Sequence, residues 1–471
     1  MVTSRKNGRC QDRQTKPQPI NADLLRRALE WLIDGDVFQR VRLHGNIRWT
    51  PYQLVSLAVV CAWSDHATLT GAFVRGVAVV LSMFGSVAVT TYLGLTKALV
   101  GWSDQLLPLL WERLHQRMEE CGGEHWRVGR WLPLAVDGSR VSTPRTRDNE
   151  RAFAAPNYGK GQTARSRKKW KNKKRRSTKR CQPVRPQIWV TLLWHMGLML
   201  PWAWKQGPST ASERGHFAEL LQERQFPENT LFCADAGFVG YELWTAILAA
   251  GHHFAIRVGA NVNLLRGLGR VRQGHGIVHV WPKHAQKHNQ PPLALRLLEF
   301  QGPRGKVCIV TSVLCDQHLS AKAVGRLYRM RWGIELQFRA FKQTFGRRQL
   351  RSRSPGCAAV EFDWSLVALW MVQLLAVKEQ IQLDIAPSRC SVAMALNLIR
   401  ELMMDRRATG TLTGYRQRIT AAVHDPYRRR GTKRGRYRSA IKEPPSATRP
   451  QVTAATRHQR EAFRRLYETP R

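Results

Sequence analysis

Residues 131–138 read WLPLAVDG, a short apolar stretch that ends in an aspartate, and residues 231–237 read LFCADAG and end in the same way. Short apolar runs that stop at a polar turn are typical of buried strands. Asp137 and Asp235 therefore each follow a predicted strand, at the position where α/β folds present reactive groups. Aspartate is also common in turns, so either residue alone fits a purely structural role.

The chain around these two stretches alternates between strand-like and helix-like patterns. Apolar runs predict strands at 188–200 (two strands around His195), 253–258, 276–281 and 307–313, and amphipathic spacing predicts helices at 212–223, 240–250, 320–345 and 364–382. Strands that alternate with helices predict an α/β core.

Residues 21–125 have a helical pattern instead. Leu24, Leu25, Leu29 and Leu32 recur at helical spacing, and Thr50-Pro51 has the composition of a helix start. Several short helices suit a DNA-binding module, and a helical packing domain fits this pattern equally well.

The net charge indicates the class of partner. Lys and Arg number 76 against 33 Asp and Glu, which gives a formal net charge of +43. Two basic runs, at 165–180 and 428–438, carry eighteen of these charges, so +25 remains on the rest of the chain. A neutral metabolic enzyme is excluded as the default, and a polyanion, most often nucleic acid, is the expected partner.

Compartment and membrane signals are weak. Residues 76–96 carry no charge over a length that could span a bilayer, but Gly85-Ser86 divides them, and we expect two buried helices with a turn between them. The N-terminus has no secretory signal, and nine cysteines without a CxxC pair indicate reduced thiols in a cytosol. His275, His279, His284 and His288 are better explained by a polar hairpin than by a zinc site, because Pro282 interrupts them.

One predicted helix aligns four polar side chains. At about 100° per residue, Tyr328, Arg331, Glu335 and Lys342 fall within an arc of roughly 60°. An apolar stripe of Ile334, Phe338, Phe341 and Phe345 lies beside them. A solvated charged face would explain the charges but not the tyrosine.

Three carboxylates from two strand ends and a helix are the donors that a divalent metal site needs. Mg²⁺ prefers a few carboxylates together with water and phosphate oxygens. Two such ions, about 3.5–4 Å apart, would activate the attacking hydroxyl and stabilise the leaving oxygen in phosphoryl displacement.

These residues resemble the blocks of DDE-type cut-and-paste transposases of the bacterial insertion-sequence-4 family. The helix YRMRWGIELQFRAFK resembles the family signature Y-x2-R-x3-E-x6-K. AVDGSRV and CADAGFVG resemble the two aspartate blocks, and SVAVTTYLGLTKAL resembles the segment that precedes them. The resemblance runs from about residue 50 to 380, and the four-residue signature is its most specific part.

The resemblance implies an RNase H-like catalytic core with a β-rich insertion, an N-terminal helical domain and a basic C-terminal tail. The expected segments are a flexible basic arm at 1–20, a helical DNA-binding domain at 21–125, the first part of the core at 130–259 with a basic loop at 142–186, the insertion at 260–317, the second part of the core at 318–385, and a basic, partly disordered C-terminal region at 386–471.

The resemblance also implies a function and roles for the site residues. Asp137, Asp235 and Glu335 would be catalytic metal ligands for Mg²⁺, with Mn²⁺ as a substitute, and Tyr328, Arg331 and Lys342 would contact transposon-end DNA. The activity would be cleavage at terminal inverted repeats and strand transfer into target DNA. The expected protein is a homodimer in the synaptic complex, cytoplasmic in a bacterium, associated with the nucleoid when bound to DNA, and without a membrane partner.

Two departures from the family pattern and two alternative functions stay open. Ala236 replaces an arginine often found after the second aspartate, Val307 stands where some members carry a base-stacking tryptophan, and Trp281 is a candidate for that role although a core or surface position suits it better. Hairpin formation is therefore not predicted. The alternatives are a DDE-fold nuclease or domesticated non-transposing relative, and a non-catalytic DNA-binding or RNA-binding protein.

Overall fold

The structure, a computed structural model, describes residues 22–153, 185–269, 276–302, 305–404, 412–424 and 449–468. The predicted basic arm at 1–20, both basic runs (165–180 and 428–438) and His275 lie outside the described residues.

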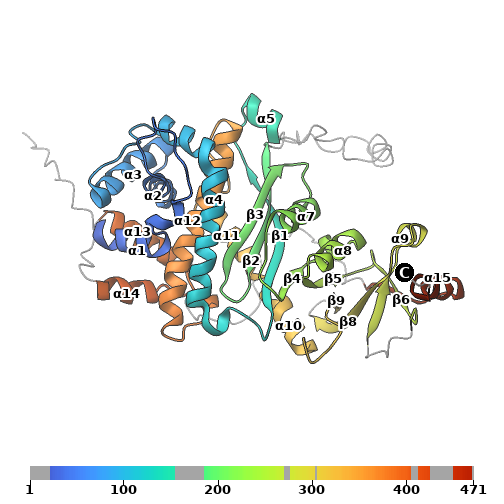
Figure 1. Cartoon of the computed structure of the whole chain (residues 1–471). Helices are drawn as coiled ribbons and strands as arrows, with labels where there is room; N and C mark the ends of the chain where they lie inside the picture. Colours follow the sequence, from blue (N-terminus) through green and yellow to red (C-terminus); the bar gives the residue numbers. More distant parts are fainter. Residues whose placement is uncertain are drawn as a thin grey trace, which may run out of the picture.

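A ten-stranded sheet runs through the described part of the chain (Figure 1). Its order is β10-β6-β7-β8-β9-β5-β4-β1-β2-β3. The mixed α/β architecture predicted from the alternating pattern is confirmed. The strands are β1 (Leu132–Ser142), β2 (Gln187–His195), β3 (Leu200–Pro208), β4 (Thr230–Ala234), β5 (His253–Val258), β6 (Asn263–Arg266), β7 (Ile277–Val280), β8 (Leu293–Gly302), β9 (Gly305–Thr311) and β10 (Gln451–Ala454).

Five strands form the part of the sheet that carries the candidate site. β1 pairs with β2 and β2 with β3 in antiparallel fashion, whereas β1 pairs with β4 and β4 with β5 in parallel. The turn at 196–199 between β2 and β3 agrees with the two strands predicted at 188–200.

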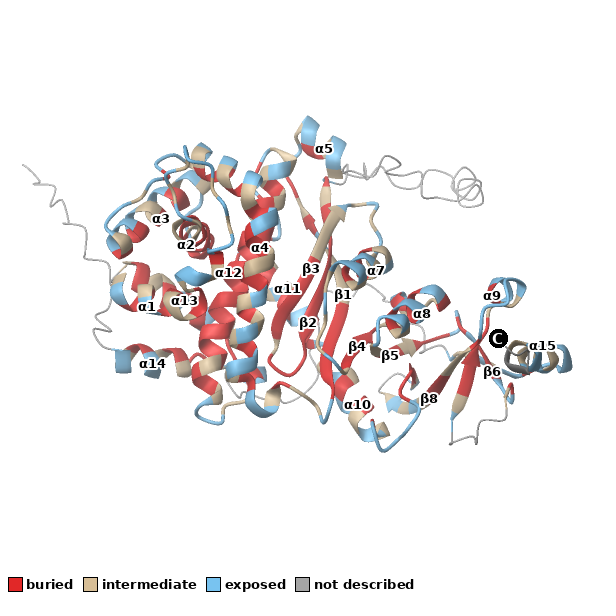
Figure 2. Ribbon diagram, viewed as in Figure 1, coloured by how far each residue is buried: buried red, intermediate tan, exposed pale blue. Residues whose placement is uncertain are grey.

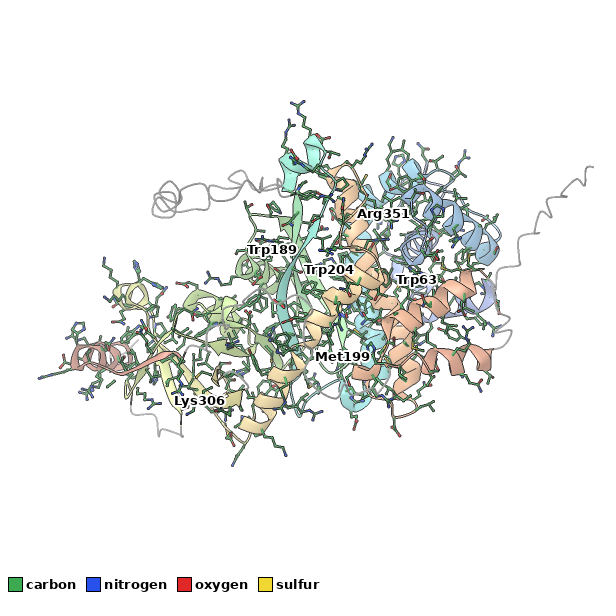
Figure 3. The ribbon with its side chains drawn as sticks, turned by 180° about the vertical axis from the view of Figure 1, so that it is seen from behind. Trp63, Trp189, Met199, Trp204, Lys306 and Arg351 are labelled. Atoms are coloured by element: carbon green, nitrogen blue, oxygen red, sulfur yellow. The ribbon has the colours of Figure 1, made fainter. Side chains whose placement is uncertain are left out.

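Helices cover both faces of these strands, and β3 shows this directly. Lys205 forms ion pairs with Glu219 and Glu223 of α7 (Glu213–Glu223). Its neighbour Trp204 points the other way and donates a hydrogen bond of 2.7 Å to Asp363 of α12 (Pro355–Ile381). Because successive side chains of a strand alternate between faces, α7 and α12 lie on opposite sides of the sheet. Figures 1 and 3 show this arrangement.

Strands β6 to β9 extend the same sheet. β9 pairs with β5, and β8, β7 and β6 follow as an antiparallel meander. β10, from the C-terminal region for which the sequence predicted only a basic segment, adds in parallel to β6. The strand-like pattern predicted at 260–317 is therefore continued by residues almost 200 positions later. Three more helices lie in this half: α8 (Tyr241–Ala249), α9 (Lys283–Lys287) and α15 (Arg457–Glu468).

The N-terminal helices pack around α12. Thr50 caps α2 by accepting a hydrogen bond from the backbone N–H of Gln53, as its sequence predicts. Gly85 ends α3 in the left-handed conformation at φ 72°, so the uncharged stretch 76–96 is two helices with a turn, as predicted. The helices of this part are α1 (Ala22–Leu32), α2 (Pro51–Trp63), α3 (Leu69–Phe84) and α4 (Tyr92–Gly122), with α13 (Val392–Met404) and α14 (Leu412–Thr420) from the C-terminal region.

Helix α12 is the apolar centre of this helical half (Figure 2). Of the described helices, it alone is long and apolar enough by composition to cross a membrane, but 89% of its most apolar window is buried inside the protein. Core helices pass the same composition test, and α12 contacts α2, α4, α13 and β3.

Three predicted element bounds were wrong. The helix predicted at 364–382 is α12, which begins nine residues earlier, at Pro355. The strand predicted to stop before Asp137 continues to Ser142, because β2 pairs with β1 along its whole length. The helix predicted at 320–345 is not continuous: α10 (Ala321–Met330) and α11 (Gly333–Arg339) are separated at Arg331 and Trp332, and a π-helical turn, η4 (Ala340–Thr344), follows. The close contact of Gly333 with the Trp194 ring accompanies this break.

Candidate active site

The two aspartates lie at the same level of neighbouring parallel strands. The β1–β4 register runs from Leu132 opposite Thr230 to Ala135 opposite Cys233. Asp137 and Asp235 each lie two residues beyond this last pair. β4 ends at Ala234, whereas β1 continues to Ser142. Among the described residues, the β4-side edge of β1 beyond this point is next paired at Ser142, which forms an isolated parallel bridge with Gln349.

Asp137 is largely enclosed. Its Oδ1 accepts a hydrogen bond of 2.9 Å from the backbone N–H of Gly138, and its Oδ2 lies 3.9 Å from Nη1 of Arg331. Burial raises the pKa of Asp137 to about 6, and the negative charges of Asp235 and Glu335 act in the same direction. The Gly138 hydrogen bond and Arg331 oppose this shift without cancelling it.

Asp235 begins the single turn η3 (Ala236–Phe238) directly after β4. Its Oδ1 accepts a hydrogen bond of 2.7 Å from the backbone N–H of Gly237. This cap fixes the side chain at the strand end and leaves it half-buried.

The signature residues divide into three groups. Tyr328 is half-buried on α10, and the guanidinium of the buried Arg331 lies 5.6 Å from the centre of its ring. Glu335 is exposed in the first turn of α11, near enough to Asp137 for its charge to raise the pKa of that residue. Lys342 donates a hydrogen bond of 2.6 Å from Nζ to Oγ of Ser139 on β1. The break at Arg331 and the π-helical turn mean that the common 60° arc calculated for an ideal helix does not describe these four residues.

A fourth acidic residue, Glu213, lies beside the two aspartates and was missed from the sequence. It is the first residue of α7. Burial raises its pKa, and the negative charges of Asp137 and Asp235 act in the same direction. In the sequence it reads as an ordinary acid in the first turn of a helix, which the helix dipole favours, so no local signal separates it from others.

Comparison with known proteins identifies the family. A sequence profile described as "Transposase DDE domain" matches residues 132–371, slightly more than half of the 471 residues. The chain belongs to the DDE transposase domain family. The match begins at the first residue of β1 and extends into α12, so it includes both aspartates, Glu213 and Glu335.

Two curated relatives agree with this assignment. The chain is 28% identical over 293 residues to the transposase InsG of insertion sequence element IS4 from Escherichia coli, covering 59% of this chain and 60% of InsG. It is 27% identical over 158 residues to the putative transposase y4zB of Sinorhizobium fredii, covering 32% of this chain and 44% of that protein. The chain thus matches 60% or less of the length of either relative, and the resemblance to insertion-sequence-4 transposases is confirmed at the level of the family.

A solved structure shows a weaker likeness. The piggyBac transposase, determined by cryo-EM in a synaptic complex with hairpin DNA, aligns over 87% of both chains with a TM-score of 0.38 and 10% identity.

DDE transposases generally use divalent metal ions. The carboxylate oxygens at this site are donors of the type that such an ion prefers. Carboxylates approach from β1, from the end of β4 and from helices on both faces, and hard cations prefer such oxygens. A Cβ atom at Gly138 would collide with the Glu213 carboxylate at 2.5 Å, and one at Gly237 would lie 3.0 Å from Oδ1 of Asp235. Within the described ranges, no three His, Cys, Asp or Glu side chains are already gathered closely enough to hold one ion. The assignment of individual ligands therefore stays a prediction.

Proposed function

We propose that this DDE-domain protein is a transposase that cleaves DNA at the terminal inverted repeats of its element and transfers the freed 3′-OH into target DNA. The single observation that carries the proposal is the level placement of Asp137 and Asp235 on parallel strands, with the signature helix α11 packed against β1. The strand order of β1 to β5 supports an RNase H-like core, with β6 to β9 as its insertion.

The proposed site residues divide into metal ligands and contacts to DNA. Asp137, Asp235 and Glu335 would hold Mg²⁺, for which Mn²⁺ would substitute, and the bound metal would supply activation of the attacking hydroxyl and stabilisation of the leaving oxygen. Arg331 compensates Asp137 while the site is free of metal, which is consistent with their distance of 3.9 Å. Tyr328, Arg331 and Lys342 contact the phosphates of the transposon end.

The partners and compartment follow from the same proposal. Transposon-end and target DNA are the substrates, and a homodimer pairs two ends in the synaptic complex. The excess positive charge of the chain, +43 in total, fits a surface that binds duplex DNA in the bacterial cytoplasm.

Hairpin formation is not part of the proposal. Trp281, the candidate for stacking on a flipped base, is 5% exposed and donates a hydrogen bond of 2.8 Å from Nε1 to the carbonyl of Gln290. Val307 lies on β9 opposite Phe300. Neither residue presents an exposed aromatic face to a base.

The test uses the full-length protein and duplex DNA from both flanks of its gene, one strand end-labelled. We expect Asp137→Asn, Asp235→Asn and Glu335→Gln each to abolish cleavage and strand transfer while binding to the ends persists. Asp148→Asn, an exposed aspartate of α5 (Arg147–Phe153), is the matched control and should retain full activity. Cleavage at the wild-type rate by any of the three variants removes that residue from the ligand set. Cleavage without joining by the wild-type protein would favour the nuclease alternative, and DNA binding without cleavage the non-catalytic one.

A further inference from the structure

The carboxylate of Glu213 lies close to two glycines, one directly after Asp137 and one two residues after Asp235. A Cβ atom added to Gly138 would come within 2.5 Å of its Oε1, and one added to Gly237 within 3.4 Å of its Oε2. Gly138 directly follows Asp137, and Gly237 donates its backbone N–H to Asp235. The absence of a side chain at Gly138 is what allows the Glu213 carboxylate to lie beside the residue that follows Asp137, and Gly237 leaves room for its second oxygen.

Helix α7 holds Glu213 in this place. Ser212 caps the helix by accepting a hydrogen bond of 2.9 Å from the backbone N–H of Gly215, and Phe217 and Leu220 are buried beneath the helix. Because both the cap and the apolar face are fixed, the first turn of α7 cannot shift without disturbing the core.

Glu213 differs from the other acids of its helix in forming no ion pair with a described residue. Glu219 and Glu223 both form ion pairs with Lys205. For the half-buried Glu213, the described residues supply neither a hydrogen bond nor an ion pair to the carboxylate. The nearby Arg140 instead places its guanidinium over the Trp189 ring, 4.5 Å from the ring centre.

A half-buried carboxylate without an ion-pair partner, next to two further carboxylates, is unfavourable unless a positive charge binds there. The charge of Arg140 offsets this only in part, because the pKa of Glu213 remains raised. Between the end of β4 and the bridge from Ser142 to Gln349, no described strand pairs with this edge of β1. Glu335 of α11 is near enough to Asp137 to influence its charge, and Glu213 of α7 is near enough to both aspartates to be influenced by theirs.

We propose that Glu213 is a fourth carboxylate of the active site and binds the same divalent cations as Asp137 and Asp235. This inference rests on the proposed function, because it takes the aspartates as metal ligands. A fourth carboxylate supplies both an oxygen ligand and a negative charge, and it comes from a helix that is fixed to the sheet rather than from a loop.

The test measures Mn²⁺ binding to the full-length protein without DNA, by isothermal titration calorimetry and by the Mn²⁺ electron paramagnetic resonance signal. Glu213→Gln keeps the shape of the side chain and removes its charge. We expect its Mn²⁺ affinity to fall by about tenfold or more, since even residues that only support ligands cost 10–100-fold. Glu219→Gln, on the same helix but paired with Lys205, should bind Mn²⁺ as the wild-type protein does.

Further variants separate the failure of this inference from that of the proposed function. If Asp137→Asn weakens Mn²⁺ binding and Glu213→Gln does not, the metal site stands and the assignment of Glu213 is wrong. If neither variant changes the affinity, the metal site at the aspartates is wrong as well. Should Glu213→Gln fail to fold, Gly138→Ala displaces the carboxylate by occupying its space, and unchanged Mn²⁺ affinity in that variant would also refute the assignment.

Discussion

Asp137 and Asp235 each lie two residues beyond Ala135–Cys233, the last pair of the parallel β1–β4 register that begins at Leu132–Thr230. Their separation is thus set by the sheet and not by loops. β1 remains hydrogen-bonded to β2 at this level, with Asp137 opposite Leu192, which holds the backbone of Asp137 rigid. Rigid placement of ligands favours a defined metal geometry.

The raised pKa of Asp137 predicts metal binding that weakens in mildly acidic solution. A carboxyl group with a pKa of about 6 is ionised at pH 7.5 and mostly protonated at pH 5.5, so a proton then competes with the cation. We expect Mn²⁺ affinity to fall by about fourfold between these pH values from this group alone. Titration calorimetry at both pH values measures it, and equal affinities would show that Asp137 has the pKa of an ordinary aspartate.

The hydrogen bond from Lys342 to Ser139 aims an ammonium group at the strand that carries Asp137. If Lys342 also contacts a phosphate, Lys342→Ala should weaken end binding and flatten the plot of log affinity against log salt by about 0.9. Ser139→Ala is the matched control, since it removes the tether and leaves the charge, and its slope should equal that of the wild-type protein. Identical slopes for Lys342→Ala and wild type would exclude the phosphate contact. Filter binding over a range of KCl concentrations measures both.

Gly333 allows α11 to lie on the sheet. A Cβ atom at this position would lie 2.0 Å from Cη2 of Trp194, which is 1% exposed and cannot easily move. Gly333→Ala should therefore lower the free energy of unfolding by about 1–3 kcal/mol through overpacking. Gly356→Ala in α12, where the nearest atom is Val100 Cγ1 at 3.5 Å, should leave it unchanged or raise it slightly. Urea denaturation of both variants distinguishes the two cases, and equal stabilities would show that Trp194 relaxes without cost.

The sequence predicted most of what local patterns control. Apolar runs identified β1, β2, β3, β4 and β5, and the Thr50 cap and the glycine turn at Gly85 were predicted correctly. The errors come from long-range pairing. The extension of β1 depends on β2, and the break at Arg331 accompanies a contact with Trp194, far away in sequence. β10 joins the sheet by pairing with β6, and no periodicity in the sequence predicts this pairing.

The candidate site also contains residues that local patterns predict and one that depends on contacts distant in sequence. Asp137, Asp235 and the signature helix were found because they follow strands or repeat at helical spacing. Glu213 was not found, because its significance depends on two glycines that bring its helix close to the strand ends. Such a relation exists only in three dimensions.

The carboxyl group of Asp363 gives the clearest expected dependence of stability on pH. It is buried between the sheet and α12, where Trp204 Nε1 and Gln206 Nε2 donate hydrogen bonds of 2.7 and 2.8 Å to its two oxygens. Burial nevertheless dominates and raises its pKa to about 7, against about 3.9 in an unfolded chain. Between these values the folded state binds more protons than the unfolded state, so rising pH removes stability.

We therefore expect the free energy of unfolding to fall by about 2 kcal/mol from pH 5 to pH 7 through Asp363 alone, and to level off above pH 7. Asp363→Asn removes this titration while its oxygen still accepts from Trp204, and the buried Oε1 of Gln206, which has no hydrogen-bond partner, offers an acceptor for the new amide. Urea denaturation at pH 5, 6, 7 and 8 measures the free energy of unfolding of the wild-type protein and of Asp363→Asn. The contributions of the other titrating groups cancel in the difference between the two proteins. A wild-type protein that gains stability relative to Asp363→Asn as the pH rises would mean that the two hydrogen bonds outweigh burial and that Asp363 is ionised in the folded state.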